Sequence, residues 1–152
     1  MDTPARLRGE VADRYAALAL RSWPDPHADR APSESESERE SDPQRYRIVA
    51  ARARLWVEVL VHRALRVDPP AGVDGAAPLW LVESLTPAGP ETLPVLHLSA
   101  GRVEDLRARF PFCGCDACDH GSDRLLDELD DAITRVIADT ESTAHRPAFG
   151  ER

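Results

Sequence analysis

A short segment in the last third of the chain concentrates the residues that could do chemistry. It holds all three cysteines and one of the five histidines. Thiolates and imidazoles are the ligands that zinc prefers in proteins, and Cys115-x-x-Cys118 has the spacing of a zinc knuckle. The segment is therefore a candidate zinc site. Its candidate ligands are Cys113, Cys115, Cys118 and His120.

The zinc interpretation lacks a second pair of ligands. A strong zinc signature repeats its ligand pair about a dozen or more residues away, and this sequence contains no such repeat. A further ligand would be an isolated histidine, a carboxylate beside the cysteines, or a residue of a second subunit. The candidates within the chain are His27, His62, His97, His145, Asp116 and Asp119.

Redox chemistry is a second interpretation of the same segment. Cys115 and Cys118 precede a predicted helix, and a helix N-terminus lowers the pKa of a nearby thiol. The carboxylates of Asp116 and Asp119 act in the opposite direction, because a nearby negative charge raises the pKa of a thiol. No thioredoxin-like alternation of strands and helices surrounds the pair. We therefore expect the net effect to disfavour a reactive thiol.

A purely structural turn is the third interpretation. Gly114 would make the turn, and Asp119 or Ser122 would cap the helix that follows. The thiols would then pack as small apolar side chains against Phe110 and Phe112. The sequence alone leaves the zinc, redox and structural interpretations open.

Other catalytic patterns do not occur in the sequence. It has no glycine-rich phosphate loop, no HExxH pair and no nucleophile elbow. The polar residues of the last predicted helix have the spacing of a solvated face. They are Asp127, Asp130, Asp131 and Arg135. An enzymatic function would therefore depend on the cysteine segment.

Composition restricts the partners and the compartment. The 152 residues favour one domain, and 27 acidic residues against 19 arginines give a net charge of −8. Such a surface repels nucleic acid and anionic membranes, so we expect neither as a partner, whereas a basic protein would suit it. The chain has no lysine and no asparagine, which is typical of a GC-rich bacterial genome. It also lacks a membrane-length apolar run and a secretion signal, which predicts a cytoplasmic protein.

Three amphipathic helices and a small sheet are expected to position the cysteine segment. A helix over 1–21 starts at Thr3-Pro4, and a flexible acidic and proline-rich linker follows over 22–41. A second, central helix runs from Asp42 to about Arg66, with a row of arginines on or near its outer face. That row consists of Arg45, Arg47, Arg52, Arg54 and Arg63.

Two short apolar runs, 79–85 and 92–98, predict an antiparallel hairpin. Pro94 cannot donate a hydrogen bond to a neighbouring strand, so we expect the second strand to lie at an edge or to begin after this residue. Residues 101–109 predict a short helical turn that leads into the cysteine segment.

A last amphipathic helix begins at Ser122 and completes the main α+β core, which we place at 42–138. A frayed polar tail is expected over 139–152. The predicted fold class is α+β, with three amphipathic helices packed on a small antiparallel hairpin or sheet in one domain.

Three segments carry a family resemblance. They are Trp23-Pro-Asp-Pro-His27, Asp42-Pro-x-Arg-Tyr-Arg-Ile48 with Ala53 and Trp56, and Cys113-Gly-Cys-Asp-Ala-Cys-Asp119 followed by Gly121-Ser122 and Leu125-Leu126. On these motifs the chain resembles an uncharacterised family of small proteins, a domain of unknown function from GC-rich, arginine-rich bacteria. The resemblance supplies no activity and no catalytic residue. It implies a shared pattern for the cysteines with Asp116 and Asp119, and more sheet-forming sequence around them.

The sequence favours a noncatalytic, cytoplasmic binding or interaction protein with a structural cysteine turn, and it leaves open whether zinc stabilises that turn. The alternative is a small thiol- or metal-dependent enzyme that uses Cys115 and Cys118.

Overall fold

The computed structural model describes residues 3–64 and 78–144 and confirms the predicted α+β class. Within these residues it has four α-helices and a three-stranded antiparallel sheet with the order β1-β2-β3. The elements in chain order are α1 (Pro4–Ala16), α2 (Glu34–Ser37), the 3-10 helix η1 (Pro43–Tyr46), α3 (Arg47–Ala64), β1 (Leu79–Ala88), β2 (Glu91–Ala100), β3 (Leu106–Phe110), the 3-10 helix η2 (Asp116–Cys118) and α4 (Ser122–Ala144).

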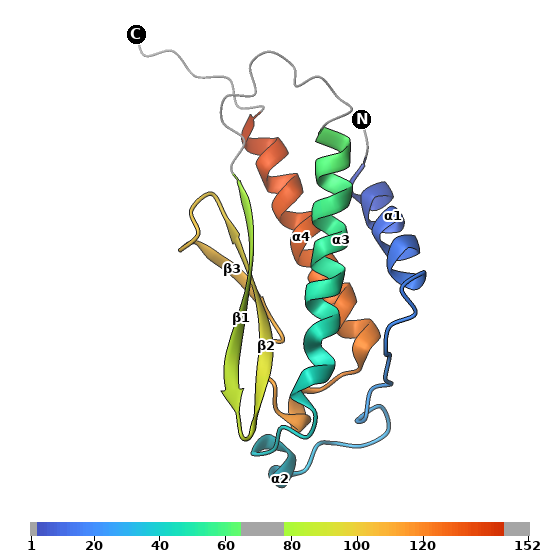
Figure 1. Ribbon diagram of the computed structural model, residues 1–152, viewed down its shortest axis with the longest axis vertical. Coiled ribbons are helices and arrows are strands. Elements are labelled where there is room, and N and C mark those ends of the chain that lie inside the picture. The colour runs from blue at the N-terminus through green and yellow to red at the C-terminus, as the bar shows by residue number, and fades with distance from the viewer. Residues whose placement is uncertain (1–2, 65–77, 145–152) are drawn as a thin grey trace.

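Two of the long helices, α3 and α4, cover one face of the sheet, and α1 lies on their far side (Figure 1). α3 contacts β2 and α4 contacts β3, while α1 packs against both α3 and α4. The short helices α2 and η2 contact each other near the hairpin turn between β1 and β2. The cysteine segment therefore lies at the end of the molecule where the hairpin turns.

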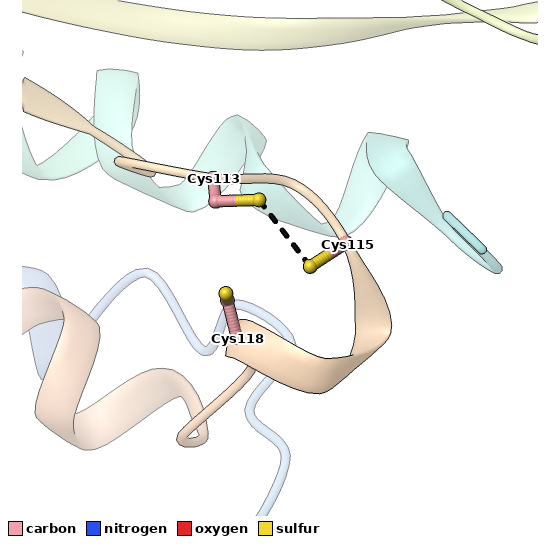
Figure 2. Close-up of side chains that lie close together, drawn as sticks. All are labelled: Cys113, Cys115 and Cys118. Carbon is pink, nitrogen blue, oxygen red and sulfur yellow. Dashed lines mark hydrogen bonds between the residues drawn. The ribbon is translucent and has the colours of Figure 1, made fainter. Parts of the chain in front are cut away.

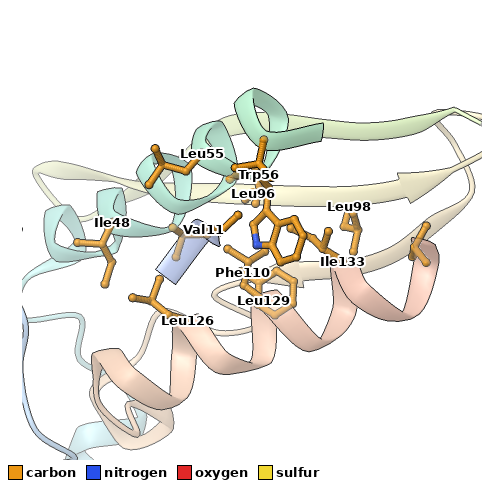
Figure 3. Packing of buried hydrophobic residues seen from close by; sticks show 14 of the residues in the cluster. Val11, Ile48, Leu55, Trp56, Leu96, Leu98, Phe110, Leu126, Leu129 and Ile133 are labelled. Carbon is orange, nitrogen blue, oxygen red and sulfur yellow. The ribbon is translucent and has the colours of Figure 1, made fainter. Parts of the chain in front are cut away.

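The core fills the space between the sheet and the helices (Figure 3). Apolar residues of α4 recur every three or four positions, which places them on one face of the helix. α3 contributes Trp56 and Val59, both fully buried. The buried residues drawn and labelled in Figure 3 are Val11, Ile48, Leu55, Trp56, Leu96, Leu98, Phe110, Leu126, Leu129 and Ile133.

The third strand corrects the expectation of a helical turn at 101–109. β3 pairs with β2 through Leu96 to Ser99, with a bulge between Leu98 and Ser99. The sequence of β3 alternates apolar and charged residues, which is the period of a strand, and its Ala108 and Phe110 pack on the core. The sheet thus has the additional strand that the family resemblance implies.

Pro94 lies in the central strand, so the expectation that its strand would lie at an edge was wrong. Both hairpin strands are also longer than predicted, and the turn between them is Gly89-Pro90. β2 pairs with β1 along its whole length, but β3 reaches only Leu96. Pro94 therefore has β1 alone as a neighbouring strand, and one side of β2 needs no ladder donor at this position.

Arg52 and Asp130 are buried, although the sequence patterns placed both on solvated faces. The guanidinium Nη2 of Arg52 lies 2.5 Å from Oδ2 of Asp130, and its Nε donates to Oδ1 at 3.1 Å. The indole Nε1 of Trp56 donates to the same carboxylate at 2.7 Å. Helical periodicity could not reveal this pair because each residue is charged and the partner lies on another helix. Arg47 and Arg54 are exposed, as expected, whereas the side chain of Arg63 lies outside the described part.

The segment predicted as a linker over 22–41 has more local structure than its composition indicates. Ser33 and Glu36 form a capping box around α2, and Glu36 is buried. Arg30 pairs with Glu36 at 2.6 Å, so the carboxylate has a charged partner within the segment.

Helix ends differ from the prediction in both directions. α1 ends at Ala16, before the predicted end at Arg21, and Ala19 adopts a positive φ of 49° shortly after it. α4 continues through Ala144, so the first part of the predicted frayed tail, 139–144, is helical. The rest of that tail, 145–152, lies outside the described residues. In the described part of the chain, none of the helices combines the length and apolar character needed to cross a bilayer.

Candidate metal centre and adjoining pocket

The three cysteines converge at one turn between β3 and α4 (Figure 2). The sulfur atoms of Cys113, Cys115 and Cys118 all lie within 4.8 Å of one another. The sulfurs of Cys113 and Cys115 lie 3.3 Å apart. Cys115 is buried, Cys113 is half-buried and Cys118 is exposed. These three side chains could hold a metal ion.

Gly114 allows the turn to pack directly on the sheet. A Cβ at this position would lie 2.5 Å from Cδ2 of Leu93 in β2, which is closer than any real Cβ contact. The absence of a side chain therefore lets the backbone between Cys113 and Cys115 pack on the side chain of Leu93. Close approach is the reason for a glycine here, and it complements the sequence interpretation that Gly114 makes the turn.

Asp116 connects the cysteine turn to the segment before η1. Its carboxylate accepts hydrogen bonds from Nε of Arg39 at 2.6 Å and from the backbone N–H of Ser41 at 2.9 Å. Its own N–H donates to the carbonyl of Arg39 at 2.7 Å. Burial alone would raise the pKa of Asp116, but the hydrogen bonds from Arg39 and Ser41 outweigh it and hold that pKa below its usual range. Asp116 is thus a charged structural contact.

Asp119 makes a second connection, to the residues before α2. Its carboxylate accepts from Nε1 of Trp23 at 2.9 Å and from the N–H of Gly121 at 3.0 Å, and it pairs with Arg45 at 3.2 Å. The backbone carbonyl of Asp119 lies 3.0 Å from Nδ1 of His27. Both acidic residues beside the cysteines therefore have protein partners already.

His120 does not join the sulfur cluster in this arrangement. Its imidazole is half-exposed, and its Nδ1 lies 3.9 Å from the carboxylate of Asp25. The group of ligand atoms within 4.8 Å of one another consists of the three thiols, among the described residues. His120 nevertheless lines the same pocket as Cys113 and Cys118.

The other histidines lie in different contacts. His27 binds Asp119 and lies 3.4 Å from Glu36, while His97 lies 2.9 Å from the hydroxyl of Ser84 within the sheet. His62 is exposed on α3. The remaining candidate, His145, lies outside the described residues.

The thiols differ in acidity. A hydrogen bond from the backbone N–H of Cys115 lowers the pKa of Cys113. A hydrogen bond with Cys115, together with burial, raises the pKa of Cys118 to about 12. The raised pKa disfavours the thiolate form of Cys118, and an ion that binds three thiolates must displace its proton.

A pocket of about 270 Å³ opens beside two of the sulfurs. Its walls combine aromatic, charged and thiol groups, which include Phe112, Cys113, Cys118, His120, Arg124 and Glu128. Phe112 has 82 % of its surface exposed at this site. The sequence did not reveal Arg124 and Glu128 as pocket residues, because on α4 they have the spacing of an ordinary i,i+4 surface pair.

Comparison with known proteins identifies the family without an activity. A model of a family of unknown function, DUF6226, matches residues 11–150. No curated protein and no solved structure matches the chain. The match covers more of the chain than the motifs that carry the resemblance and includes the whole cysteine segment. The chain belongs to this family of unknown function, DUF6226.

Proposed function

We propose that this protein is a noncatalytic binding or interaction protein whose cysteine turn holds one zinc ion. The observation that supports it is the convergence of three sulfur atoms within 4.8 Å from a single short turn. Neighbouring thiols with no ion gain little from such an arrangement, whereas a thiophilic cation stabilises three thiolates that would otherwise repel one another.

Zinc fits this donor set better than magnesium or calcium do. Those hard cations prefer oxygen ligands, but the only carboxylates in the turn, Asp116 and Asp119, already bind Arg39 and Arg45 within the described structure. With Zn–S bonds of about 2.3 Å, tetrahedral geometry requires sulfurs about 3.8 Å apart. The separations in the turn, from 3.3 Å to less than 4.8 Å, bracket that value.

The ion would stabilise more than the turn itself. Asp116 and Asp119 flank the ligand Cys118 and hold Arg39 and Trp23 of the preceding segment. An ion that fixes the turn would therefore also fix these contacts between the N-terminal part of the chain and the start of α4. This is the behaviour of a structural zinc site, in which binding free energy adds to folding free energy.

The surface charge indicates the kind of protein that would bind. A net charge of −8 suits a basic protein partner through electrostatic complementarity. The alternative of a thiol enzyme with Cys115 and Cys118 has less support, because the raised pKa of Cys118 disfavours a thiolate nucleophile.

Native mass spectrometry with elemental analysis tests the zinc proposal. We expect about one zinc per chain purified under reducing conditions, and a fall in melting temperature when a chelator removes it. Single Cys113→Ser, Cys115→Ser and Cys118→Ser variants should each lose most of the zinc. His62→Ala, which removes an exposed imidazole from α3, is the matched control and should keep it. A reduced wild-type chain that neither retains zinc nor gains thermal stability from added zinc would refute the proposal.

A further inference from the structure

We propose that the fourth ligand of this ion comes from outside the chain, and that it is a neutral nitrogen donor of the imidazole class bound in the pocket beside Cys113 and Cys118. This inference rests on the proposed zinc site. It adds a binding activity, because an ion with three protein ligands and an accessible fourth position can hold an external molecule.

The first step concerns the donors within the chain. Asp119 binds three partners, and Asp116 binds Arg39 and Ser41. His120 lies beside Asp25, and none of these groups belongs to the cluster of ligand atoms within the described residues. The described chain thus presents three thiols to an ion and directs its neighbouring oxygen and nitrogen donors elsewhere.

The second step concerns access. Cys115 is buried, and the neighbouring Gly114 packs closely on the side chain of Leu93. Cys113 and Cys118 line the pocket, and Cys118 is exposed. A molecule in the pocket therefore lies beside the two sulfurs that line it. A volume of about 270 Å³ is sufficient for a five-membered ring.

The third step concerns charge. Three thiolates and one divalent cation carry a net charge of −1, and an anionic donor would make it −2 in a protein of net charge −8. Arg124 is the single arginine among the described lining residues, and its Nε binds Glu128 at 3.0 Å. The second lining carboxylate, Asp119, is bound to Arg45. The guanidinium that lines the pocket is thus already paired with a carboxylate, which favours a neutral donor at the ion.

The fourth step concerns the shape and chemistry of the donor. Tyr46, Phe112 and Leu125 provide aromatic and aliphatic walls that suit a flat ring. Imidazole nitrogen is a preferred zinc ligand, and a metal-bound imidazole usually donates its second N–H to a carboxylate. Glu128 lines the pocket, and its Oε2 can accept this hydrogen bond while its Oε1 binds Arg124. The ring could belong to a free small molecule or to a histidine side chain of another protein.

Cobalt(II) substitution tests this inference on the full-length protein. The cobalt-loaded chain should show visible bands of a thiolate-bound ion, and titration with imidazole should change them saturably with about one imidazole per cobalt. Acetate serves as the anionic probe and should bind about tenfold more weakly or not at all. A short neutral peptide with one histidine, used as a further probe, separates the two sources: tighter binding than imidazole indicates a protein side chain, and weaker binding indicates a small molecule.

Two variants identify a fourth ligand from within the chain. His145→Ala should leave the cobalt bands and the imidazole response of the wild type unchanged. His120→Ala alters the wall of the pocket, so only its cobalt bands are expected to match those of the wild type. If imidazole leaves the cobalt bands of the wild type unchanged but changes those of only one variant, the histidine replaced in that variant is the fourth ligand. The inference is then wrong. Cobalt bands that do not change with imidazole in any variant, or that change equally with acetate, also overturn the inference. Failure to form thiolate-bound cobalt at all would instead refute the zinc proposal.

Discussion

The indole Nε1 of Trp23 donates a hydrogen bond of 2.9 Å to the carboxylate of Asp119, next to the last cysteine of the turn. The backbone of Trp23 binds the same region: its N–H donates to Oγ of Ser122, and its carbonyl accepts from the N–H of Ser122, both at 3.0 Å. Trp23 therefore joins the segment after α1 to the beginning of α4.

Replacing Trp23 by phenylalanine should lower the free energy of unfolding by about 1–3 kcal/mol, because it removes a hydrogen bond to a buried carboxylate. Trp80→Phe is the matched control. The Nε1 of Trp80 also donates a hydrogen bond of 3.0 Å, to the carbonyl of Gly101, but the side chain is 42 % exposed. We expect its loss to cost less than about 1 kcal/mol. Urea denaturation measures the free energy of unfolding of both variants. Equal decreases would show that the hydrogen bond to Asp119 contributes no more than the exposed one.

The buried pair of Arg52 and Asp130 predicts a second difference. Asp130→Ala leaves a buried guanidinium without its carboxylate and should destabilise the fold by about 3–5 kcal/mol. Asp127→Ala on the exposed side of α4 removes a pairing with Arg8 and should cost less than about 1 kcal/mol.

A double variant separates charge burial from packing at the same site. Arg52→Met combined with Asp130→Leu removes both charges and should recover most of the stability that Asp130→Ala loses. Calorimetric melting temperatures report both comparisons. A double variant as unstable as Asp130→Ala would mean that the hydrogen bond from Trp56 to Asp130, rather than the ion pair, carries the contribution.

Glu36 predicts a pH dependence of stability. A hydrogen bond from Arg30, supported by those from Ser33, holds the pKa of Glu36 well below its usual range. The unfolded chain therefore takes up a proton at a higher pH than the folded chain does. The stabilisation is complete above the usual glutamate pKa of about 4.3 and is lost as the pH falls below it.

The measurement is the free energy of unfolding between neutral and acidic pH. Glu36→Gln should be less stable than the wild type at neutral pH, and the difference should shrink as the solution becomes acidic. Glu34→Gln, on the same helical turn but exposed, should follow the wild-type profile. A gap between Glu36→Gln and wild type that widens in acid would contradict the assigned sign.

Two glycines should respond to alanine in opposite directions. Gly121 has a φ of +84°, and a Cβ there would lie 2.7 Å from the backbone nitrogen of Asp25. Gly121→Ala should therefore destabilise the protein by more than about 1 kcal/mol and separate the Trp23 segment from α4. Gly9 lies within α1 with no atom within 4 Å of an added Cβ.

Gly9→Ala should stabilise the protein by about 0.5–1 kcal/mol, because alanine favours the helix and reduces the entropy of the unfolded chain. Both variants can be compared by thermal unfolding followed by circular dichroism. If Gly121→Ala is as stable as the wild type, the close backbone approach at Asp25 is not required.

Local patterns predicted most of the elements, and long-range contacts explain most of the errors. The apolar spacing on α4 identified that helix because its period is long and regular. β3 was missed because five residues of alternating character also fit a short turn, and only pairing with β2 makes them a strand. Arg52 was placed in solvent because nothing near it in sequence indicates the distant Asp130.

At the candidate site, too, local sequence patterns predicted one part of the arrangement, and long-range contacts determine the rest. Short spacing in the sequence was sufficient to predict that the three cysteines would lie together, and the structure places their sulfurs so. The partners of Asp116 and Asp119 come from the segment before α3, whose composition resembles a linker. The sequence could not show that these carboxylates already bind other side chains. Because of these contacts they are unsuitable as ion ligands.

The connection between Trp23 and α4 also has a consequence for synthesis on the ribosome. α1 and the residues that follow it are made first, yet their partners Asp119, Ser122 and α4 are made last among the described elements. The first helix can pack on α3 earlier, but it lacks its contacts with α4 until translation of α4 is finished. Nascent chains that stop before Ser122 should accordingly be targets for chaperones and proteases, however well their hairpin has formed.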